Sequence, residues 1–192
     1  RAPLIEKTKP LYRPGYFRYV PRCHHPIPGH ASISNFTIHF GQCRHLLLVD
    51  DKGGLVDAPL VAIEGEAWRL FAGPGRGTEL AAWLERWVIV DDVAIETDPR
   101  PAWLLGEADA ATSSIFAPAT GAGPAVQVGE APPNPLSLAE WDAACFRAGR
   151  CFAGTPTSTR PNPLELGWKS LIAFDKGCYI GQEVIARMDT YD

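Results

Sequence analysis

The octapeptide KGCYIGQE, from Lys176 to Glu183, places two glycines four residues apart around a thiol and a phenol. Gly177 and Gly181 permit backbone conformations and close approaches that a side chain would forbid, so we expect the segment between them to form a tight loop. The window also carries a cation, an amide and a carboxylate, and only Ile180 suits a purely apolar position. This composition indicates a functional site that the rest of the chain must fold to present.

The residues around the loop indicate individual roles. A positive charge at Lys176 favours the thiolate of Cys178 where the two side chains approach each other. Residues 182–187 predict a short helix with Glu183 near its start, where the helix dipole favours negative charge. Glu183 and Arg187 stand four residues apart and can pair on one face. In the alternative interpretation Cys178 is a small buried apolar side chain, as free cysteines usually are.

The octapeptide closely resembles the signature of the YgfZ-like folate-binding proteins, relatives of the aminomethyltransferase of the glycine cleavage system. Upstream, the segment NPLELGW at 162–168 is similar to the family's approach to this signature, and the turn DKGG at 51–54 resembles a turn of the same fold. The resemblance covers about residues 44–187. It implies a folate-binding accessory protein that supports iron-sulfur cluster assembly or repair, and through it iron-sulfur enzymes that include tRNA-modifying ones.

The same resemblance implies the site residues and the partners. Cys178 and Lys176 are the candidate catalytic pair, in which Cys178 is the key thiol and Lys176 tunes or orders it. Tetrahydrofolate or a derivative is the implied cofactor, and iron-sulfur proteins are the implied clients. We expect neither independent catalysis nor direct contact with nucleic acid or a membrane. The candidate ligand-binding residues are Tyr179, Gln182, Glu183, Arg187 and Arg147.

The chain departs from the family pattern at Arg147. In the aminomethyltransferases a glutamate near this place hydrogen-bonds the pterin ring, and an arginine cannot accept hydrogen bonds from a pterin amino group. Arg147 suits a folate carboxylate instead, because its fork of donors matches that group. Family members also continue past the signature into a small β-barrel, whereas this chain stops at Asp192. We therefore expect an aminomethyltransferase-like folate-binding domain that lacks the C-terminal β-barrel.

Two alternative functions stay open. One is a folate-dependent aminomethyltransferase of the glycine-cleavage type, a one-carbon transferase. Those enzymes carry a sequence of the type FIGRE at the signature, whereas this chain has Cys178 and Gln182. The other is a fragment without a ligand that binds a partner through apolar surface, because an exposed apolar patch marks an interface.

Composition agrees with a cytoplasmic protein. The hydrophobic content of 46% and the charged content of 21% are ordinary for a globular chain of 192 residues. A net charge of -4 gives no overall attraction to nucleic acid or to anionic membranes. No apolar run reaches the length of a membrane span, and the first ten residues lack a signal-peptide core. The five irregularly spaced cysteines predict reduced thiols rather than a disulfide framework.

Residues 1–43 predict an irregular segment rich in proline and histidine, apart from a possible strand at 36–40. Cys23, His24, His25 and His30 raise the question of zinc, but adjacent ligands followed by prolines fit no usual ligand spacing, so we expect no metal site. For the remainder, 44–192, the resemblance implies one aminomethyltransferase-like folate-binding domain.

That domain is expected to be α+β, with antiparallel sheets and covering helices. Strands are predicted at 45–50, 55–63, 67–71, 88–97 and 125–128, with another starting at Trp103. A helix over 78–88 is expected to bury Leu80, Trp83, Leu84 and Trp87, with Thr78 as its cap.

The composition of residues 108–135 predicts loops around the single strand at 125–128. The sequence SLAE after them is a capping box, in which Ser137 and Glu140 exchange hydrogen bonds at the start of a helix that runs to about residue 148. Cys145 falls on the apolar face of that helix and is assigned to the core.

Overall fold

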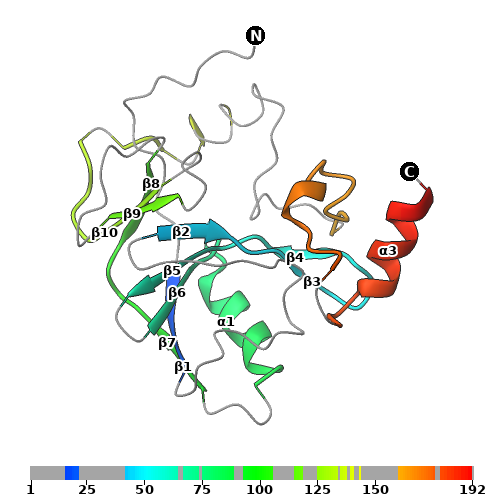
Figure 1. The fold of residues 1–192 in the computed structure, drawn as a ribbon. Coiled ribbons are helices and arrows are strands. Elements are labelled where there is room, and N and C mark those ends of the chain that lie inside the picture. Colours follow the sequence, from blue (N-terminus) through cyan, green and yellow to red (C-terminus); the bar gives the residue numbers. More distant parts are fainter. Residues whose placement is uncertain are drawn as a thin grey trace.

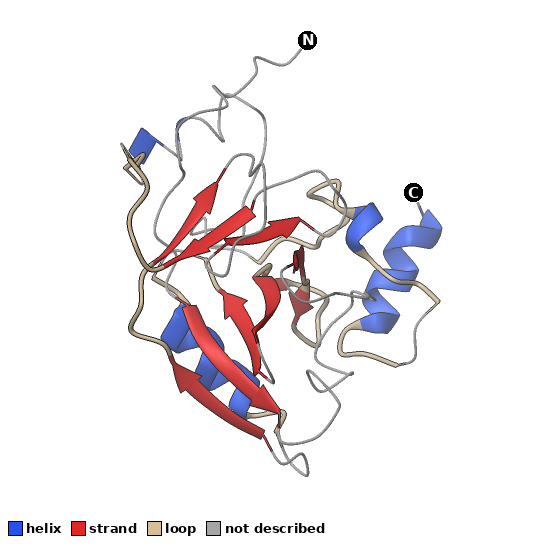
Figure 2. Ribbon diagram, turned by 60° about the vertical axis from the view of Figure 1, so that its left-hand side comes forward, coloured by secondary structure: helices blue, strands red, loops and turns tan. Residues whose placement is uncertain are grey.

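The computed structural model describes residues 16–21, 42–64, 67–73, 75–88, 93–105, 115–118, 125–133, 135–137, 139–140, 143, 160–175 and 178–191. Within these residues the fold is α+β, as expected. An eight-stranded sheet and a two-stranded sheet are accompanied by helices on one face and at one end (Figures 1 and 2). No helix in the described residues is long and apolar enough to cross a membrane.

A long bent hairpin forms the centre of the molecule. Its inner part pairs β2 (Gln42–His45) with β5 (Leu60–Glu64) in the large sheet. Its outer part pairs β3 (Leu48–Val49) with β4 (Leu55–Asp57) in the small sheet. Figure 1 shows the hairpin extending from the large sheet toward the C-terminal helix. The tip of the hairpin therefore lies well away from the centre of the large sheet.

The bend corrects the prediction of two uninterrupted strands at 45–50 and 55–63. Pro59 lies at the break and has no N–H to donate to a strand ladder. Its carbonyl still accepts a hydrogen bond from the backbone N–H of Leu46, at 2.9 Å. The hairpin thus stays joined at the bend while its strands pass from one sheet to the other.

The large sheet continues on one side through β6 (Ala67–Phe71), β1 (Tyr16–Pro21) and β7 (Val93–Thr97). The expectation of an irregular N-terminal segment is wrong for β1, which lies between β6 and β7 and pairs antiparallel with both. The backbone of β1 pairs with a neighbouring strand on each side, so the strand forms although its sequence shows no alternation of apolar residues. The possible strand at 36–40 lies outside the described residues, and the division at residue 43 stays a prediction.

On the other side the sheet runs from β2 to β9 (Ile115–Pro118), β10 (Ala125–Val128) and β8 (Ala102–Leu105). The strands predicted at 125–128 and from Trp103 are confirmed. The prediction of loops elsewhere between 108 and 135 is wrong at β9. That strand pairs parallel with β2, so the sheet is mixed rather than purely antiparallel. A four-residue strand that ends in proline gives too short a pattern to predict.

Helix α1 (Gly77–Glu85) packs on one face of the sheet (Figure 2). Leu80, Trp83 and Leu84 are buried in the core between helix and sheet, as the helical spacing predicted. The helix ends at Glu85 rather than at the predicted residue 88, so Trp87 lies beyond it, partly buried against the same core. The cap prediction is wrong. The helix begins one residue before Thr78, and no side chain caps its N-terminus.

The capping box is confirmed. The backbone N–H of Ser137 donates to the Glu140 carboxylate at 2.8 Å, and the N–H of Glu140 donates to the Ser137 hydroxyl at 3.3 Å. Most of the helix that this box begins lies outside the described residues, including Cys145.

Candidate functional site

The tip of the central hairpin is a tight turn built on Asp50. One oxygen of its carboxylate accepts the backbone N–H groups of Lys52, at 3.0 Å, and Gly54, at 2.9 Å. Its backbone carbonyl accepts the N–H of Gly53, also at 3.0 Å. Gly53 has a φ of +73°, a conformation that side chains rarely adopt. The sequence DDKGG thus supplies both the side-chain acceptor and the glycine that the turn requires.

The segment NPLE lies directly against this turn. The side-chain amide of Asn162 donates to the carbonyl of Gly53 at 3.1 Å, and its side-chain oxygen accepts the N–H of Leu164 at 2.9 Å. The carboxylate of Glu165 accepts the backbone N–H of Asn162 at 2.7 Å. Asn162 is only 6% exposed. The side-chain amide and the backbone N–H of this buried asparagine therefore serve the local turn and the hairpin tip.

Two further contacts attach the same segment to the hairpin. Arg160 forms an ion pair with Asp50 at 3.2 Å, and both side chains are partly exposed. The carbonyl of Pro161 accepts the N–H of Leu55 at 2.9 Å. Residues more than 100 positions apart are thereby joined at the tip.

The signature loop approaches the tip through its second glycine. Gly181 has a φ of +75°, and a Cβ added to it would stand 2.5 Å from the carbonyl oxygen of Asp50 and 3.1 Å from the Cα of Gly53. Contacts below 3.0 Å do not occur for real Cβ atoms. The expectation that a glycine here permits a close approach is confirmed for Gly181.

The loop divides its two reactive side chains between solvent and core. Cys178 is exposed, whereas Tyr179 is buried. Tyr179 joins an apolar cluster with Leu47, Val49, Ala58, Ile172 and Ile185. Burial raises the pKa of the Tyr179 phenol. The interpretation of Cys178 as a buried apolar side chain is therefore wrong. Tyr179 attaches the loop to the core by packing in the apolar cluster.

Helix α3 (Gln182–Tyr191) follows directly, longer than the predicted 182–187. Gln182 is half-buried at its first position, and Ile185 faces the apolar cluster. The predicted pair is confirmed, since Arg187 donates to Glu183 at 2.6 Å with both side chains exposed. The helix thus presents an amide, a carboxylate and a guanidinium beside the loop.

A short 3-10 helix, η1 (Lys169–Leu171), connects the NPLE segment with the signature. Lys169 forms an ion pair with Asp189 of α3. Leu164, Trp168 and Leu171 pack against the cluster that holds Tyr179. Figure 1 shows this orange segment and the red helix together at the hairpin tip.

Three candidate residues of the signature and its surroundings are not placed. Lys176, Gly177 and Arg147 lie outside the described residues, so their roles stay predictions. The same holds for Cys23, His24, His25 and His30. Across the residues that can be described, no three histidine, cysteine or acidic side chains gather in a way that could hold a metal ion.

Sequence reasoning missed Asp57, a fully buried carboxylate at the end of β4. One of its oxygens accepts the N–H of Ala58 at 2.7 Å, and the other forms an ion pair with Nε of Arg76 at 3.5 Å. Burial raises the pKa of Asp57, although the Ala58 N–H and the charge of Arg76 oppose this. The signal available in the sequence was an acidic residue within the otherwise apolar segment 55–63, which the sequence predicts as one strand.

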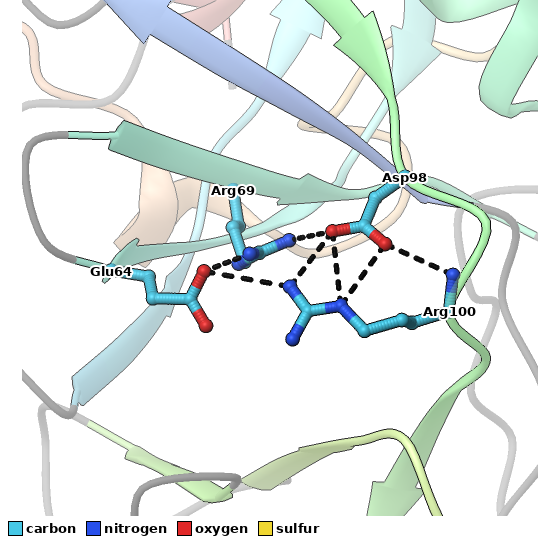
Figure 3. Close-up of polar contacts among 4 residues, drawn as sticks. All are labelled: Glu64, Arg69, Asp98 and Arg100. Carbon is cyan, nitrogen blue, oxygen red and sulfur yellow. Dashed lines mark hydrogen bonds and ion pairs between the residues drawn. The ribbon is translucent and has the colours of Figure 1, made fainter.

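A second polar cluster was also missed. Arg69 on β6 is 2% exposed and pairs with both Glu64 and Asp98 (Figure 3). Arg100 contacts the same two carboxylates from the solvent side, Asp98 at 2.9 Å and Glu64 at 3.6 Å. Two cations and two anions balance, so this cluster joins the ends of strands rather than offering a charged site.

Comparison with known proteins places this geometry in context. No known protein-family profile matches the chain. A chloroplastic protein of Arabidopsis thaliana, provisionally named a transferase, is 40% identical over 58 residues, which are 30% of this chain and 13% of that protein. The crystal structure of the glycine cleavage system aminomethyltransferase T from Bartonella henselae superposes with a TM-score of 0.66 at 13% identity.

That superposition covers 96% of this chain and 64% of the aminomethyltransferase chain. It shows that the chain has the fold of part of aminomethyltransferase T, as the signature led us to expect. The chain spans less than two thirds of the length of each of these two proteins.

Proposed function

We propose that this chain is a folate-binding accessory protein that supports iron-sulfur cluster assembly or repair, and through it iron-sulfur enzymes such as those that modify tRNA. The observation that carries the proposal is the meeting of three sequence segments at one place. The DKGG turn, the NPLE segment and the signature loop all contact one another through Gly53. These are the segments in which the chain resembles the YgfZ-like proteins.

Two side chains of α3 are of the chemical types that recognise a folate. A pterin ring needs a partner that both donates and accepts, which the half-buried amide of Gln182 provides. The glutamate tail of a folate carries carboxylates, which match the exposed guanidinium of Arg187. In this proposal Gln182 and Arg187 hold the two ends of the ligand, with Arg147 as a further partner for its carboxylates.

Cys178 has the exposure that a reacting thiol requires. Structural cysteines are typically buried and inert, whereas reactive ones are accessible to solvent. In the proposed function this thiol acts on behalf of the iron-sulfur client proteins, and Lys176 orders it.

Binding is tested by anaerobic calorimetry with tetrahydrofolate and its formyl and methylene forms, with the Cys178→Ser variant alongside. Saturable binding to both proteins is the expected result, since the thiol is not assigned to ligand recognition. Absence of binding to the unaltered chain would defeat the folate proposal.

The iron-sulfur part is tested by complementation. In a strain that lacks its own protein of this kind, the unaltered chain should restore the activity of an iron-sulfur enzyme, and Cys178→Ser should not. Full restoration by Cys178→Ser would make Cys178 dispensable and overturn its assignment.

Folate-dependent aminomethyl transfer is the second candidate, favoured by the fold shared with aminomethyltransferase T. The assay supplies a lipoyl-bound aminomethyl group and tetrahydrofolate and measures methylene-tetrahydrofolate and ammonia. We expect no turnover, because the signature holds Cys178 and Gln182 in place of the transferase sequence. Sustained turnover would favour the transferase over the accessory role.

A further inference from the structure

Gly53 is enclosed on two sides by elements that are far apart in the sequence. A Cβ built on it would lie 3.0 Å from the side-chain nitrogen of Asn162 and 3.2 Å from a methyl group of Val184 in α3. Its Cα and N in turn limit the approach of Gly181. A single backbone residue of the hairpin tip therefore contacts the NPLE segment, the signature loop and the first turn of α3.

The side-chain amide of Asn162 holds Gly53 from the NPLE side by a hydrogen bond to the Gly53 carbonyl. The bond is buried, and a buried carbonyl that loses its donor is left with an uncompensated desolvation cost. Because no side chain lies between Gly53 and Gly181, any displacement of Gly53 passes directly to the loop. A flexible side chain at this contact could change its rotamer and absorb the displacement, whereas two glycines have no side chain that could do so.

We infer that Asn162 is a positioning residue for the loop that carries Cys178. Its amide holds the Gly53 carbonyl, Gly53 sets the position of Gly181, and Gly181 sets where the exposed thiol stands relative to α3. Asn162 touches no reacting group in this arrangement and acts only through the hairpin tip. The inference deepens the proposed function, on which its biological meaning rests, but the positioning itself can be measured without folate.

The test variant is Asn162→Asp, which keeps the volume of the side chain and the oxygen that accepts the Leu164 N–H. It replaces the donor to Gly53 with a carboxylate oxygen, which repels the carbonyl. The control is Gln127→Glu, which makes the same chemical change at an exposed hydrogen bond, where the Gln127 amide donates to the carbonyl of Glu130 at 2.9 Å. Both variants remove one amide-to-carbonyl hydrogen bond, but only one of them touches the hairpin tip.

The readout is the ¹⁹F resonance of a trifluoromethyl label on Cys178, identified by its absence in Cys178→Ser and recorded without folate. We expect Asn162→Asp to shift or broaden this resonance and Gln127→Glu to leave it unchanged. An unchanged resonance in folded Asn162→Asp would overturn the inference. So would equal changes in both variants, because the effect would then not depend on the hairpin tip.

Should Asn162→Asp not fold, Glu165→Ala decides the question. It removes the carboxylate that holds the Asn162 backbone N–H but leaves the amide of Asn162 in place, and Glu165 is exposed. We expect a smaller change of the Cys178 resonance in the same direction, and no change would overturn the inference. Failure of the unaltered chain to bind folate would defeat the proposed function alone, since the label reports the loop position in either case.

Discussion

Gly181 and Asp50 lie so close that a Cβ on the glycine would stand 2.5 Å from the carbonyl oxygen of the aspartate. The signature loop and the hairpin tip therefore meet backbone to backbone. Such a contact fixes the distance between the two segments more tightly than a contact through flexible side chains would, because close-packed protein interiors have low compressibility. The second glycine of the signature is explained by this contact as much as by its own left-handed conformation.

Gly181→Ala is expected to destabilise the protein by about 3 kcal/mol. The left-handed backbone costs an alanine roughly 1–2 kcal/mol, and overpacking against fixed backbone adds about 1–3 kcal/mol. The free energy of unfolding is measured by urea titration monitored by tryptophan fluorescence.

Gly75→Ala is the control for this substitution. Gly75 has nearly the same φ, +70°, but nothing lies within 4 Å of its added Cβ. It should lose only the backbone part, roughly 1–2 kcal/mol. Equal losses in the two variants would show that the close approach of Gly181 to Asp50 has no energetic weight.

Arg69→Met is expected to cost about 3–5 kcal/mol, because it leaves the Asp98 and Glu64 carboxylates without their buried partner. Asp98 has a side chain only 9% exposed. The loss is measured by the same urea titration at low and high salt. It should change little with salt, since buried pairs are screened much less than exposed ones.

Arg100→Ala tests the solvent side of the same cluster. The Arg100 side chain is 48% exposed, and an exposed ion pair contributes only about 0–1 kcal/mol. If Arg100→Ala lowered the free energy of unfolding as much as Arg69→Met does, the two arginines would contribute jointly. The ion pairs of exposed Arg100 would then not be the minor part of the cluster.

Much of the candidate site was predictable because its chemistry is local. Glycines beside a thiol marked the signature loop, and the spacing of Glu183 and Arg187 predicted their pair. The exposure of Cys178 was not predictable from its residue type, since free cysteine side chains are often buried in a core. Tyr179 stays a candidate ligand-binding residue by resemblance, but its place in an apolar cluster was not predictable, because distant residues such as Leu47 and Ile172 contribute to that cluster.

Features that depend on distant partners escaped prediction. β1 is specified by strands on both sides of it, and the contact of Asn162 with Gly53 spans 109 positions. The NPLE segment was recognised by resemblance, but no local pattern could say that its asparagine would reach the hairpin tip. The balanced cluster around Arg69 draws on the ends of β5 and β7, which only the folded sheet brings together.

Ser137→Ala is expected to lower the free energy of unfolding by about 1 kcal/mol, the usual cost of losing a serine cap. Thr78→Ala should have almost no effect, because no side chain caps α1. The two variants are compared by urea titration. A loss at Thr78 that matched the loss at Ser137 would contradict the assignment of the caps.

Of the two free thiols that the structure describes, Cys43 is buried and Cys178 is exposed. Cys43 on β2 is 1% exposed, and burial raises its pKa to about 12, although a backbone hydrogen bond from Val126 opposes this. Iodoacetamide reacts with thiolates, so at pH 8 the native protein should be alkylated at Cys178 and spared at Cys43. Peptide mass spectrometry distinguishes the two sites, and both should react in urea. Alkylation of Cys43 at the rate of Cys178 under native conditions would contradict its burial.

The same pKa predicts a pH dependence of stability. The Cys43 thiol is raised from a reference value of 9.0, so its contribution to folding is fully present below about pH 9 and is lost as the pH rises toward about 12. Cys43→Ala removes this dependence, and other groups titrate equally in both proteins. Over that interval the unaltered chain should lose up to about 1.4 kcal/mol per pH unit more than the variant. Parallel curves of unfolding free energy against pH would show that Cys43 does not titrate on unfolding.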